Sequence, residues 1–419
     1  MRLMMLFVFV GCGLDTSGKN HCETKADCLE GLTCNADHTC GQPTSCTLHE
    51  CGSQCGSVSD GCGGMMDCGM CPVQDHCTDG VIGWGETDVD CGGVCNACAT
   101  GLTCNATSDC ATGTCEGHTC LAGTWTTAAE MPTARTTLGA VAVGGLIYAI
   151  GGYTLSGVTG VVEVYNPQTD SWTTKAPMPT PRYGFGIAVG GDGLIYTVGG
   201  QYDSNTFTDG LSVVVEAYNP TTNAWSTKPS LPNGRYSTAA AASNGAIYVT
   251  GGISVNPTEL LGTAVEYTPG DVGWTTVADT MTTARDSHAS IATSDGTVYA
   301  IGGSPSGGET TAVESYKPGV AGWNTVAPLP VALKGLAAAV VHDKVFTFGG
   351  NYPMATYATF VNSYNPATHT WTKAASLVHG RFGHSAVTAS NGRVYVLGGG
   401  GGPQAANTTS AVDVYVPDP

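Results

Sequence analysis

Residues 146–172 read LIYAIGGYTLSGVTGVVEVYNPQTDSW, and the pattern of this stretch decides the fold. An apolar run ends in Gly151-Gly152, a second run ends at Tyr165, and Trp172 follows seven residues later. Short apolar runs bounded by glycine and by Asn-Pro are typical of β-strands joined by tight turns. The stretch therefore predicts three successive short strands.

The same unit occurs six times after residue 120. The glycine pairs are separated by 48, 52, 51, 47 and 49 residues, which marks a repeat architecture. They stand at 151–152, 199–200, 251–252, 302–303, 349–350 and 398–399. Five copies keep the seven-residue interval from tyrosine to tryptophan: Tyr165 and Trp172, Tyr218 and Trp225, Tyr267 and Trp274, Tyr316 and Trp323, Tyr364 and Trp371.

Each unit also contains a hairpin before its glycine pair. In the first unit Gly144-Gly145 separates two apolar runs, and Asn244-Gly245, Asp295-Gly296 and Asn391-Gly392 hold the same place later. Four short antiparallel strands per unit of about 50 residues form one blade of a radial propeller. The period and the glycine doublet resemble the kelch family, whose fold galactose oxidase's central domain shares. The resemblance covers residues 123–419 and implies an all-β, six-bladed propeller.

The two ends of this region predict how the ring closes. The sixth unit ends at Tyr415 with no tryptophan after it, while Trp125 stands alone before the first unit. We therefore expect residues 123–127 to form the outer strand of the last blade, which leaves no exposed sheet edge.

The nineteen cysteines predict a different kind of structure nearer the N-terminus. All lie between Cys12 and Cys120, and eighteen fall in residues 22–120. Such density is typical of disulfide-stabilised exported chains. The segment ending at Cys40 matches the segment ending at Cys120, so we expect a stalk of small disulfide-rich modules in residues 22–120 and a propeller in residues 121–419.

The first residues resemble an export signal. Met1-Arg2 precedes an eight-residue apolar run, which is too short to span a bilayer. Val10-Gly11-Cys12 resembles the bacterial lipoprotein box, although Phe9 replaces the preferred leucine. This implies a signal in residues 1–12, acylation of Cys12, a tether in residues 13–21, and a bacterial outer-membrane or cell-surface location. A secretory signal cleaved elsewhere, giving a secreted protein, is the alternative.

Metal and redox sites are weighed against simpler explanations. Cys68 and Cys71, and likewise Cys95 and Cys98, have a spacing that suits zinc or thiol chemistry, but structural disulfides are favoured in an oxidising compartment. Glu86, Asp88 and Asp90 could hold calcium, and solvated charge is the favoured explanation. We expect no metal and no cofactor.

Charge excludes one class of partner. Residues 1–120 carry 15 acidic and 3 basic side chains (−12), and residues 121–419 carry 18 and 12 (−6). There is no basic stripe for phosphate contacts, so a nucleic-acid partner is not expected. Any association with a membrane would depend on the lipid anchor.

A repeated arginine provides the candidate ligand site. It precedes the innermost strand and should lie at the same end of the propeller as the glycine doublets and the variable loops after them. Guanidinium groups near the axis suit a carboxylate ligand, and kelch adaptors that capture acidic peptides use arginines at this position. The alternative is that the arginines bond backbone carbonyls of neighbouring blades. The candidate ligand-binding residues are Arg135, Arg182, Arg235, Arg285, Lys334 and Arg381.

These residues favour a surface-tethered protein that binds a protein, peptide or glycan, with no enzymatic activity. The second hypothesis is a sugar-acting exported enzyme resembling the six-bladed kelch mutarotases of sialic acid, with an acid/base carboxylate beside the arginines. Four carboxylates could serve: Asp203, Asp209, Glu259 and Glu309. A copper-radical oxidase is disfavoured, because its cysteine–tyrosine cross-link would need a cysteine in residues 121–419.

Overall fold

The computed structural model describes Cys91, residues 97–202, 213–255, 258–306, 308–352, 356–401 and 408–418, and the backbone of six short strands nearer the N-terminus. Contacts divide the chain into two units between Ala111 and Thr112. The boundary therefore lies nine residues before the end of the predicted stalk, and residues 112–120 belong to the same unit as the propeller.

Short hairpins make up the described strands of the first unit. Cys98 forms a disulfide with Cys91. Cys98 is therefore part of a structural cross-link, as the sequence favoured over zinc or thiol chemistry. A 3₁₀ turn, η2 (Thr107–Asp109), follows. The strands pair as β1 (Gly13–Leu14) with β2 (Asn20–His21), β3 (Thr33–Cys34) with β4 (Cys40–Gly41), and β5 (Ser57–Ser59) with β6 (Met65–Asp67).

The second unit begins with one more hairpin of this kind. Its strands are β7 (Cys115–Glu116) and β8 (Thr119–Cys120). In their backbone register Cys115 lies opposite Cys120, as Cys34 lies opposite Cys40 in β3 and β4. The repeated cysteine motif of the sequence thus forms the same hairpin twice. The β7–β8 hairpin contacts the fifth blade, because Glu116 accepts hydrogen bonds from Lys373 at 2.6 Å and from the Ser376 hydroxyl at 2.9 Å.

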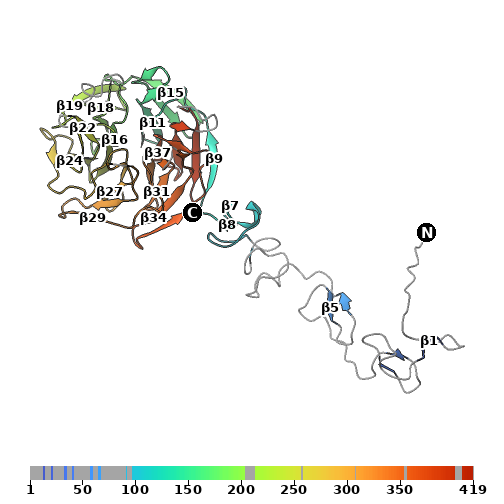
Figure 1. Cartoon of the computed structure of the whole chain (residues 1–419). Coiled ribbons are helices and arrows are strands. Elements are labelled where there is room, and N and C mark those ends of the chain that lie inside the picture. Colours follow the sequence, from blue (N-terminus) through green and yellow to red (C-terminus); the bar gives the residue numbers. More distant parts are fainter. Residues whose placement is uncertain are drawn as a thin grey trace. The chain divides into compact units, whose positions relative to one another are not determined.

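Six four-stranded antiparallel sheets form the propeller (Figure 1). Blade 1 is β10 (Gly139–Val143), β11 (Leu146–Ile150), β14 (Val162–Asn166) and β15 (Ser171–Lys175). Blade 2 is β16 (Gly186–Val189), β17 (Ile195–Val198), β18 (Val215–Asn219) and β19 (Ala224–Lys228). Blade 3 is β20 (Ala239–Ser243), β21 (Ala246–Thr250), β24 (Ala264–Tyr267) and β25 (Thr275–Thr276).

The other three blades have the same strand order. Blade 4 is β26 (Ala289–Ala292), β27 (Val298–Ile301), β28 (Val313–Tyr316) and β29 (Trp323–Thr325). Blade 5 is β30 (Ala337–Val341), β31 (Lys344–Phe348), β34 (Val361–Asn365) and β35 (Thr370–Lys373). Blade 6 is β37 (Ser385–Thr388), β38 (Val394–Leu397), β40 (Val412–Val416) and β9 (Thr124–Ala128).

The ring closes as the sequence predicted. Strand β9 pairs antiparallel with β40, with Trp125 opposite Tyr415, and the cyan β9 lies beside the red C-terminal strands in Figure 1. The Trp125 indole N–H donates to the Ala375 carbonyl of the preceding blade at 2.9 Å. Both chain ends of the domain are therefore held in one sheet.

The repeated aromatic residues pack the blades together. In blade 1 the rings of Tyr165 and Trp172 lie 5.2 Å apart, and the Trp172 indole donates to the Ala129 carbonyl at 2.8 Å. Equivalent pairs and bonds recur, with Trp225 donating to Ala176 and Trp371 to Ala327. The tyrosine–tryptophan interval therefore serves blade packing.

Additional hairpins lie where the second strand of a blade leads into the third. The loops beside them vary in length, and they belong to the end of the propeller at which the glycine doublets stand. These strands are β12 (Tyr153–Thr154) with β13 (Gly157–Val158), β22 (Ile253–Val255) with β23 (Thr258–Leu260), and β32 (Asn351–Tyr352) with β33 (Thr356–Tyr357). In blade 6, β36 (Arg381–Phe382) pairs with β39 (Gly400–Gly401) and extends the pairing of β37 with β38 at this end.

Candidate functional site: the axial rim

The repeated arginines are buried, which corrects the prediction that they line an open face. The side chains of Arg135, Arg182, Arg285 and Arg381 have no exposed area, and Arg235 is 2% exposed. Four of them pair with a carboxylate on the third strand of the same blade. The pairs are Arg135–Glu163 and Arg182–Glu216, each at 2.9 Å, and Arg285–Glu314 and Arg381–Asp413.

Backbone carbonyls accept further hydrogen bonds from the terminal nitrogens of these guanidinium groups. Arg135 donates to Ala149 O at 3.1 Å, and Arg235 donates to Gly251 O and Thr263 O at 3.2 and 3.3 Å. Backbone carbonyls therefore accept from the arginines, but they lie in the arginine's own blade and not in the neighbouring blades that the alternative explanation named. Burial lowers the pKa of Arg182 to about 10, and Glu216 opposes this shift, so the ion pair persists at neutral pH.

The backbone at the arginine position joins each blade to the one before it. The carbonyl of Arg182 accepts a hydrogen bond from the Gly152 N–H at 3.0 Å. A Cβ at Gly151 would lie 2.8 Å from that carbonyl oxygen, and the φ of Gly151 is +59°. The doublet is therefore glycine because the next blade approaches closely and the backbone is left-handed.

Blade 5 differs from this pattern at both ends of the ion pair. Leu333 occupies the arginine position, where its carbonyl accepts from the Gly303 N–H. Asn362 occupies the carboxylate position of β34. Blade 3 loses only the anion: Val265 occupies the carboxylate position there, and backbone carbonyls accept from Arg235.

Lys334 therefore has a different role from the five arginines. It lies one residue after the arginine position, its side chain is 37% exposed, and its ammonium pairs with Glu309 at 3.0 Å. Glu309, one of the predicted acid/base candidates, thus contacts Lys334 instead of an arginine.

Lys334 belongs to a ring of six residue pairs that we call the axial rim. Each pair joins the residue after the arginine position to the residue after the glycine doublet by an antiparallel bridge. The pairs are Thr136–Tyr153, Tyr183–Gln201, Tyr236–Ile253, Asp286–Ser304, Lys334–Asn351 and Phe382–Gly400.

A backbone ring supports the axial rim. The residue after each rim position has a positive φ between 49° and 61°, namely Thr137, Gly184, Ser237, Ser287, Gly335 and Gly383. The N–H of one member bonds the carbonyl of another across the blade boundary, as from Gly335 to Ser287 at 2.7 Å and from Gly383 to Gly335 at 2.8 Å. The rim side chains are thus carried on a fixed frame.

The chemistry of the rim changes around the ring. Tyr153 and Tyr183 on blades 1 and 2 contact each other with ring centroids 5.4 Å apart, and the Tyr183 hydroxyl donates to Gln201 Oε1 at 2.7 Å. On blade 4, burial raises the pKa of Asp286, opposed by a hydrogen bond from Ser287 and by the charge of Lys334. One side of the rim is aromatic and the other is charged.

Below the rim, the six innermost strands surround a cavity of about 420 Å³. Alanines and glycines of β10, β16, β20, β26, β30 and β37 supply much of its wall, and no Lys, Arg, Asp or Glu is among its lining residues. His384 is the titratable group there, and burial lowers its pKa to about 3. Specific polar chemistry is therefore concentrated at the rim.

The other predicted candidates are placed as follows. Glu259 lies exposed in β23. Cys12, Asp203, Asp209, Glu86, Asp88, Asp90, Cys68, Cys71 and Cys95 lie outside the described residues.

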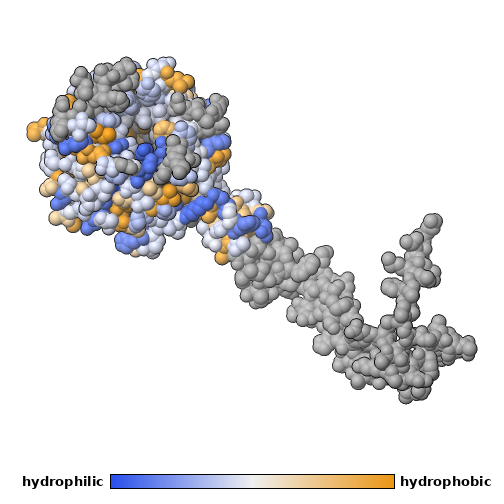
Figure 2. Space-filling model, viewed as in Figure 1, coloured by the Kyte–Doolittle hydropathy of each residue, from blue (hydrophilic) through white to orange (hydrophobic). Residues whose placement is uncertain are grey.

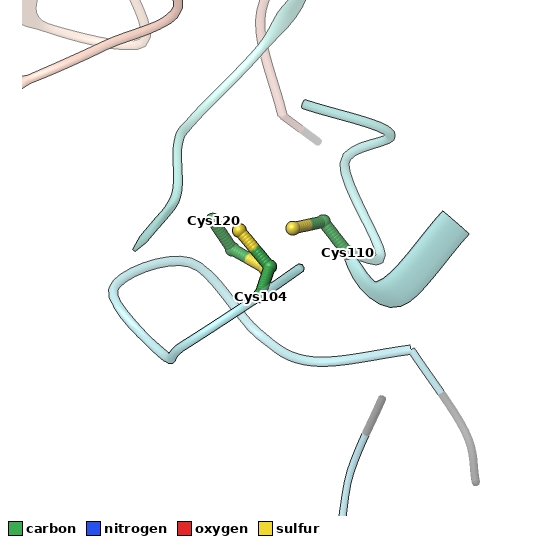
Figure 3. A group of neighbouring side chains, drawn as sticks. All are labelled: Cys104, Cys110 and Cys120. Atoms are coloured by element: carbon green, nitrogen blue, oxygen red, sulfur yellow. The ribbon is translucent and has the colours of Figure 1, made fainter. Parts of the chain in front are cut away.

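Three cysteines raise the question of a metal site. The sulfur atoms of Cys104, Cys110 and Cys120 lie within 4.8 Å of one another (Figure 3). Each of them is disulfide-bonded, so none offers the thiolate that a metal requires.

Among the described residues, no helix has the length and apolarity to cross a bilayer.

The axial rim was not recognised from the sequence, although a signal was present. The arginine before it and the left-handed residue after it recur, whereas the rim position itself holds Thr, Tyr, Tyr, Asp, Lys and Phe in the six blades. Repeated positions support the scaffold, and the varied position between them lies at the end of the propeller that carries the variable loops.

Known proteins resemble the propeller half of the chain. The kelch motif matches residues 134–179 and 181–232. Kelch-like protein 23 of Homo sapiens is 30% identical over 208 residues, covering 49% of this chain and 36% of that protein. Kelch-like protein terF of Aspergillus terreus is 31% identical over 246 residues, covering 54% of this chain and 51% of that protein.

A solved structure titled "Structure of YjhT" has a TM-score of 0.58 at 19% identity, and covers 68% of this chain and 95% of that one. At this identity the likeness concerns the fold alone. The chain spans 36% to 51% of the length of the two curated relatives above. The predicted kelch repeats and six-bladed propeller are confirmed.

Proposed function

We propose that this chain is an exported binding protein whose propeller recognises a protein ligand at the axial rim. Kelch propellers generally act as protein-interaction modules. Six blades of nearly the same construction give a rigid platform, and the rim is the part whose side chains differ from blade to blade.

One observation carries this proposal: the rim side chains vary from blade to blade on a frame whose geometry is repeated. The buried position before the rim is arginine in five blades, and the position after it is Gly, Ser or Thr with a positive φ in all six. The rim position instead combines hydroxyl, aromatic, acidic and basic side chains, all partly exposed: Thr136, Tyr183, Tyr236, Asp286, Lys334 and Phe382. Binding sites typically combine such varied side chains on a rigid scaffold.

A random peptide library displayed on phage, selected against the full chain, tests the proposal. Selected peptides should lose at least tenfold in affinity when Tyr153→Ser and Tyr236→Ser are combined. The matched control is Asp271→Asn with Asp343→Asn, in turns at the opposite end of the propeller, and it should bind as the parent does. Peptides that bind the rim variant unchanged, while its thermal unfolding is also unchanged, would contradict the proposal.

A sugar-acting enzyme remains the second candidate, because Glu309 stands beside Lys334 on the rim. A carboxylate next to a cation could move a proton at a sugar that carries an acid group. However, the buried arginines supply no clamp, and the one ammonium is engaged by Glu309. Anomer exchange of sialic acid, followed by NMR with and without the protein, separates the two: acceleration that Glu309→Gln abolishes would support the enzyme.

Export and anchoring are part of the proposal. The apolar run before Cys12 and the disulfides of the stalk support an oxidising compartment, and acylation of Cys12 would tether the chain to a membrane. Expression in a bacterium with a labelled fatty acid tests the tether. The label should appear on the parent and be absent from Cys12→Ala, and an unlabelled parent would favour secretion.

A further inference from the structure

The end of the propeller that carries the axial rim is negatively charged, whereas exposed arginines would have made it positive. The loops that run from each glycine doublet to the following tyrosine contain no lysine or arginine in any of the six blades. Before the third strand begins, their described residues include two carboxylates, Glu259 and Glu309, and the rim adds Asp286. The accessible charge at this end is therefore mainly negative.

The lysine and arginine side chains near the rim do not make the accessible charge at this end positive. The five repeated arginines are buried with carboxylates or carbonyls. Lys334 is partly exposed, but its ammonium is paired with Glu309 at 3.0 Å and also faces Asp286. A carboxylate ligand would have to compete with both groups for this one ammonium, whereas a cationic ligand meets carboxylates on blades 3 and 4.

The same end exposes apolar and aromatic groups on blades 1 and 2. Leu155, at the tip of the β12–β13 hairpin, is 80% exposed, and Tyr202 and Val213, in the blade 2 loop, are 46% and 40% exposed. Leu155 lies two residues after Tyr153, and Tyr202 follows Gln201, the rim partner of Tyr183. Exposed apolar groups at the same end as a polar site favour a contact surface for a protein.

We infer that the ligand of the axial rim is a polypeptide segment that presents lysine or arginine side chains to blade 4 and an apolar or aromatic side chain to blades 1 and 2. The inference rests on the proposed function and adds the chemistry of the partner. Asp286 and Glu309 would receive the cationic group, and Tyr153, Tyr183 and Leu155 would contact the apolar one. Arginine or lysine paired with a carboxylate in a half-buried site gives strong, directional contacts.

Three synthetic peptide libraries test this directly. Each contains twelve-residue peptides with the same tyrosine and leucine content, and they differ only in four positions fixed as lysine, glutamine or glutamate. At low salt the full chain should bind the lysine set at least fivefold more tightly than the glutamine set, and least tightly the glutamate set. The preference should shrink at 0.5 M salt, since exposed charges are screened.

Two variants locate the effect. Asp286→Asn with Glu309→Gln removes two negative charges from the rim and should reduce lysine-set binding by threefold to tenfold. Asp271→Asn with Asp343→Asn removes the same charge from the opposite end and should leave binding unchanged.

The outcomes separate this inference from the proposed function. Stronger binding of the glutamate set, no binding of the lysine set, or equal loss in both variants overturns the inference. If binding falls with Tyr153→Ser and Tyr236→Ser but is indifferent to peptide charge, the rim remains the site and the charge inference is wrong. If neither rim variant changes binding, both the inference and the proposed function fail.

Discussion

Buried arginines couple strand to strand inside the blades. The Arg182 guanidinium pairs with Glu216 and also bonds the Val214 carbonyl at 2.8 Å. The second Glu216 oxygen accepts from the Thr180 hydroxyl at 3.0 Å. A buried ion pair is costly to break on one side only, because the remaining charge is left without a partner.

The chain itself offers the substitution that tests this coupling. Arg182→Leu alone should lower the free energy of unfolding by about 3–5 kcal/mol, since Glu216 stays buried and unpaired. Adding Glu216→Asn reproduces the Leu333 and Asn362 arrangement of blade 5 and should recover most of the loss. Urea unfolding of both variants measures the coupling, and a double variant no more stable than the single one would contradict it.

Two buried histidines give the propeller a dependence on pH. Burial lowers the pKa of His288 and of His384 to about 3, with the neighbouring arginines adding to the shift. The Nε2 of His384 contacts the Phe348 carbonyl at 3.0 Å, while its Nδ1 is buried with no hydrogen-bond partner. The folded state therefore holds both rings neutral.

Because the folded pKa is depressed, stability is complete above the unfolded value near 6.5 and is lost as pH falls toward 3. Each histidine should contribute a slope of up to about 1.4 kcal/mol per pH unit in that window. His384→Gln keeps a donor for Phe348 and should flatten the decline in melting temperature between pH 6.5 and 4. An equally steep decline in this variant would show that other groups dominate.

At the scale of elements, the closing strand β9 holds the ring together. Trp125 packs against Tyr415 with ring centroids 5.2 Å apart and against Phe348 at 6.0 Å, and its indole bonds blade 5. Replacing residues 124–128 by a five-residue Gly-Ser segment should cost at least about 3 kcal/mol, because the packing of a half-buried tryptophan and one strand pairing are lost. Differential scanning calorimetry checks this, and an unchanged melting temperature would refute closure by β9.

The blade elements could be predicted from the sequence because each depends on a local constraint. The glycine doublets, the Asn-Gly and Gly-Gly turns and the tyrosine–tryptophan interval are dictated by backbone geometry and packing within one repeat, and six copies reinforce each other. The burial of the arginines could not be predicted from the residues around them, since their carboxylate partners lie 28 to 34 residues further along the chain. Blade 5 replaces both residues, but blade 3 keeps Arg235 with Val265 at the carboxylate position, so the sequence contains no consistent signal for the pairing.

For the whole molecule, the distribution of cysteine corresponds to two modes of stabilisation. Cross-links such as Cys91–Cys98 stabilise short segments with little core, while the cysteine-free blades rely on packing between sheets. On the propeller face seen in Figure 2, hydrophilic and apolar residues are interspersed, as is usual for a protein surface. Selective recognition must therefore come from a localised site such as the rim.

Hydrogen–deuterium exchange of the full chain, with and without a selected peptide at saturating concentration, tests the central claim most directly. The account predicts slower exchange in segments that carry the rim, residues 135–138, 153–158, 183–186, 236–239, 286–289 and 334–337. Exchange in the opposite turns, residues 269–273 and 342–344, should stay the same. Protection confined to those opposite turns or to the outer strands would contradict a binding site at the axial rim.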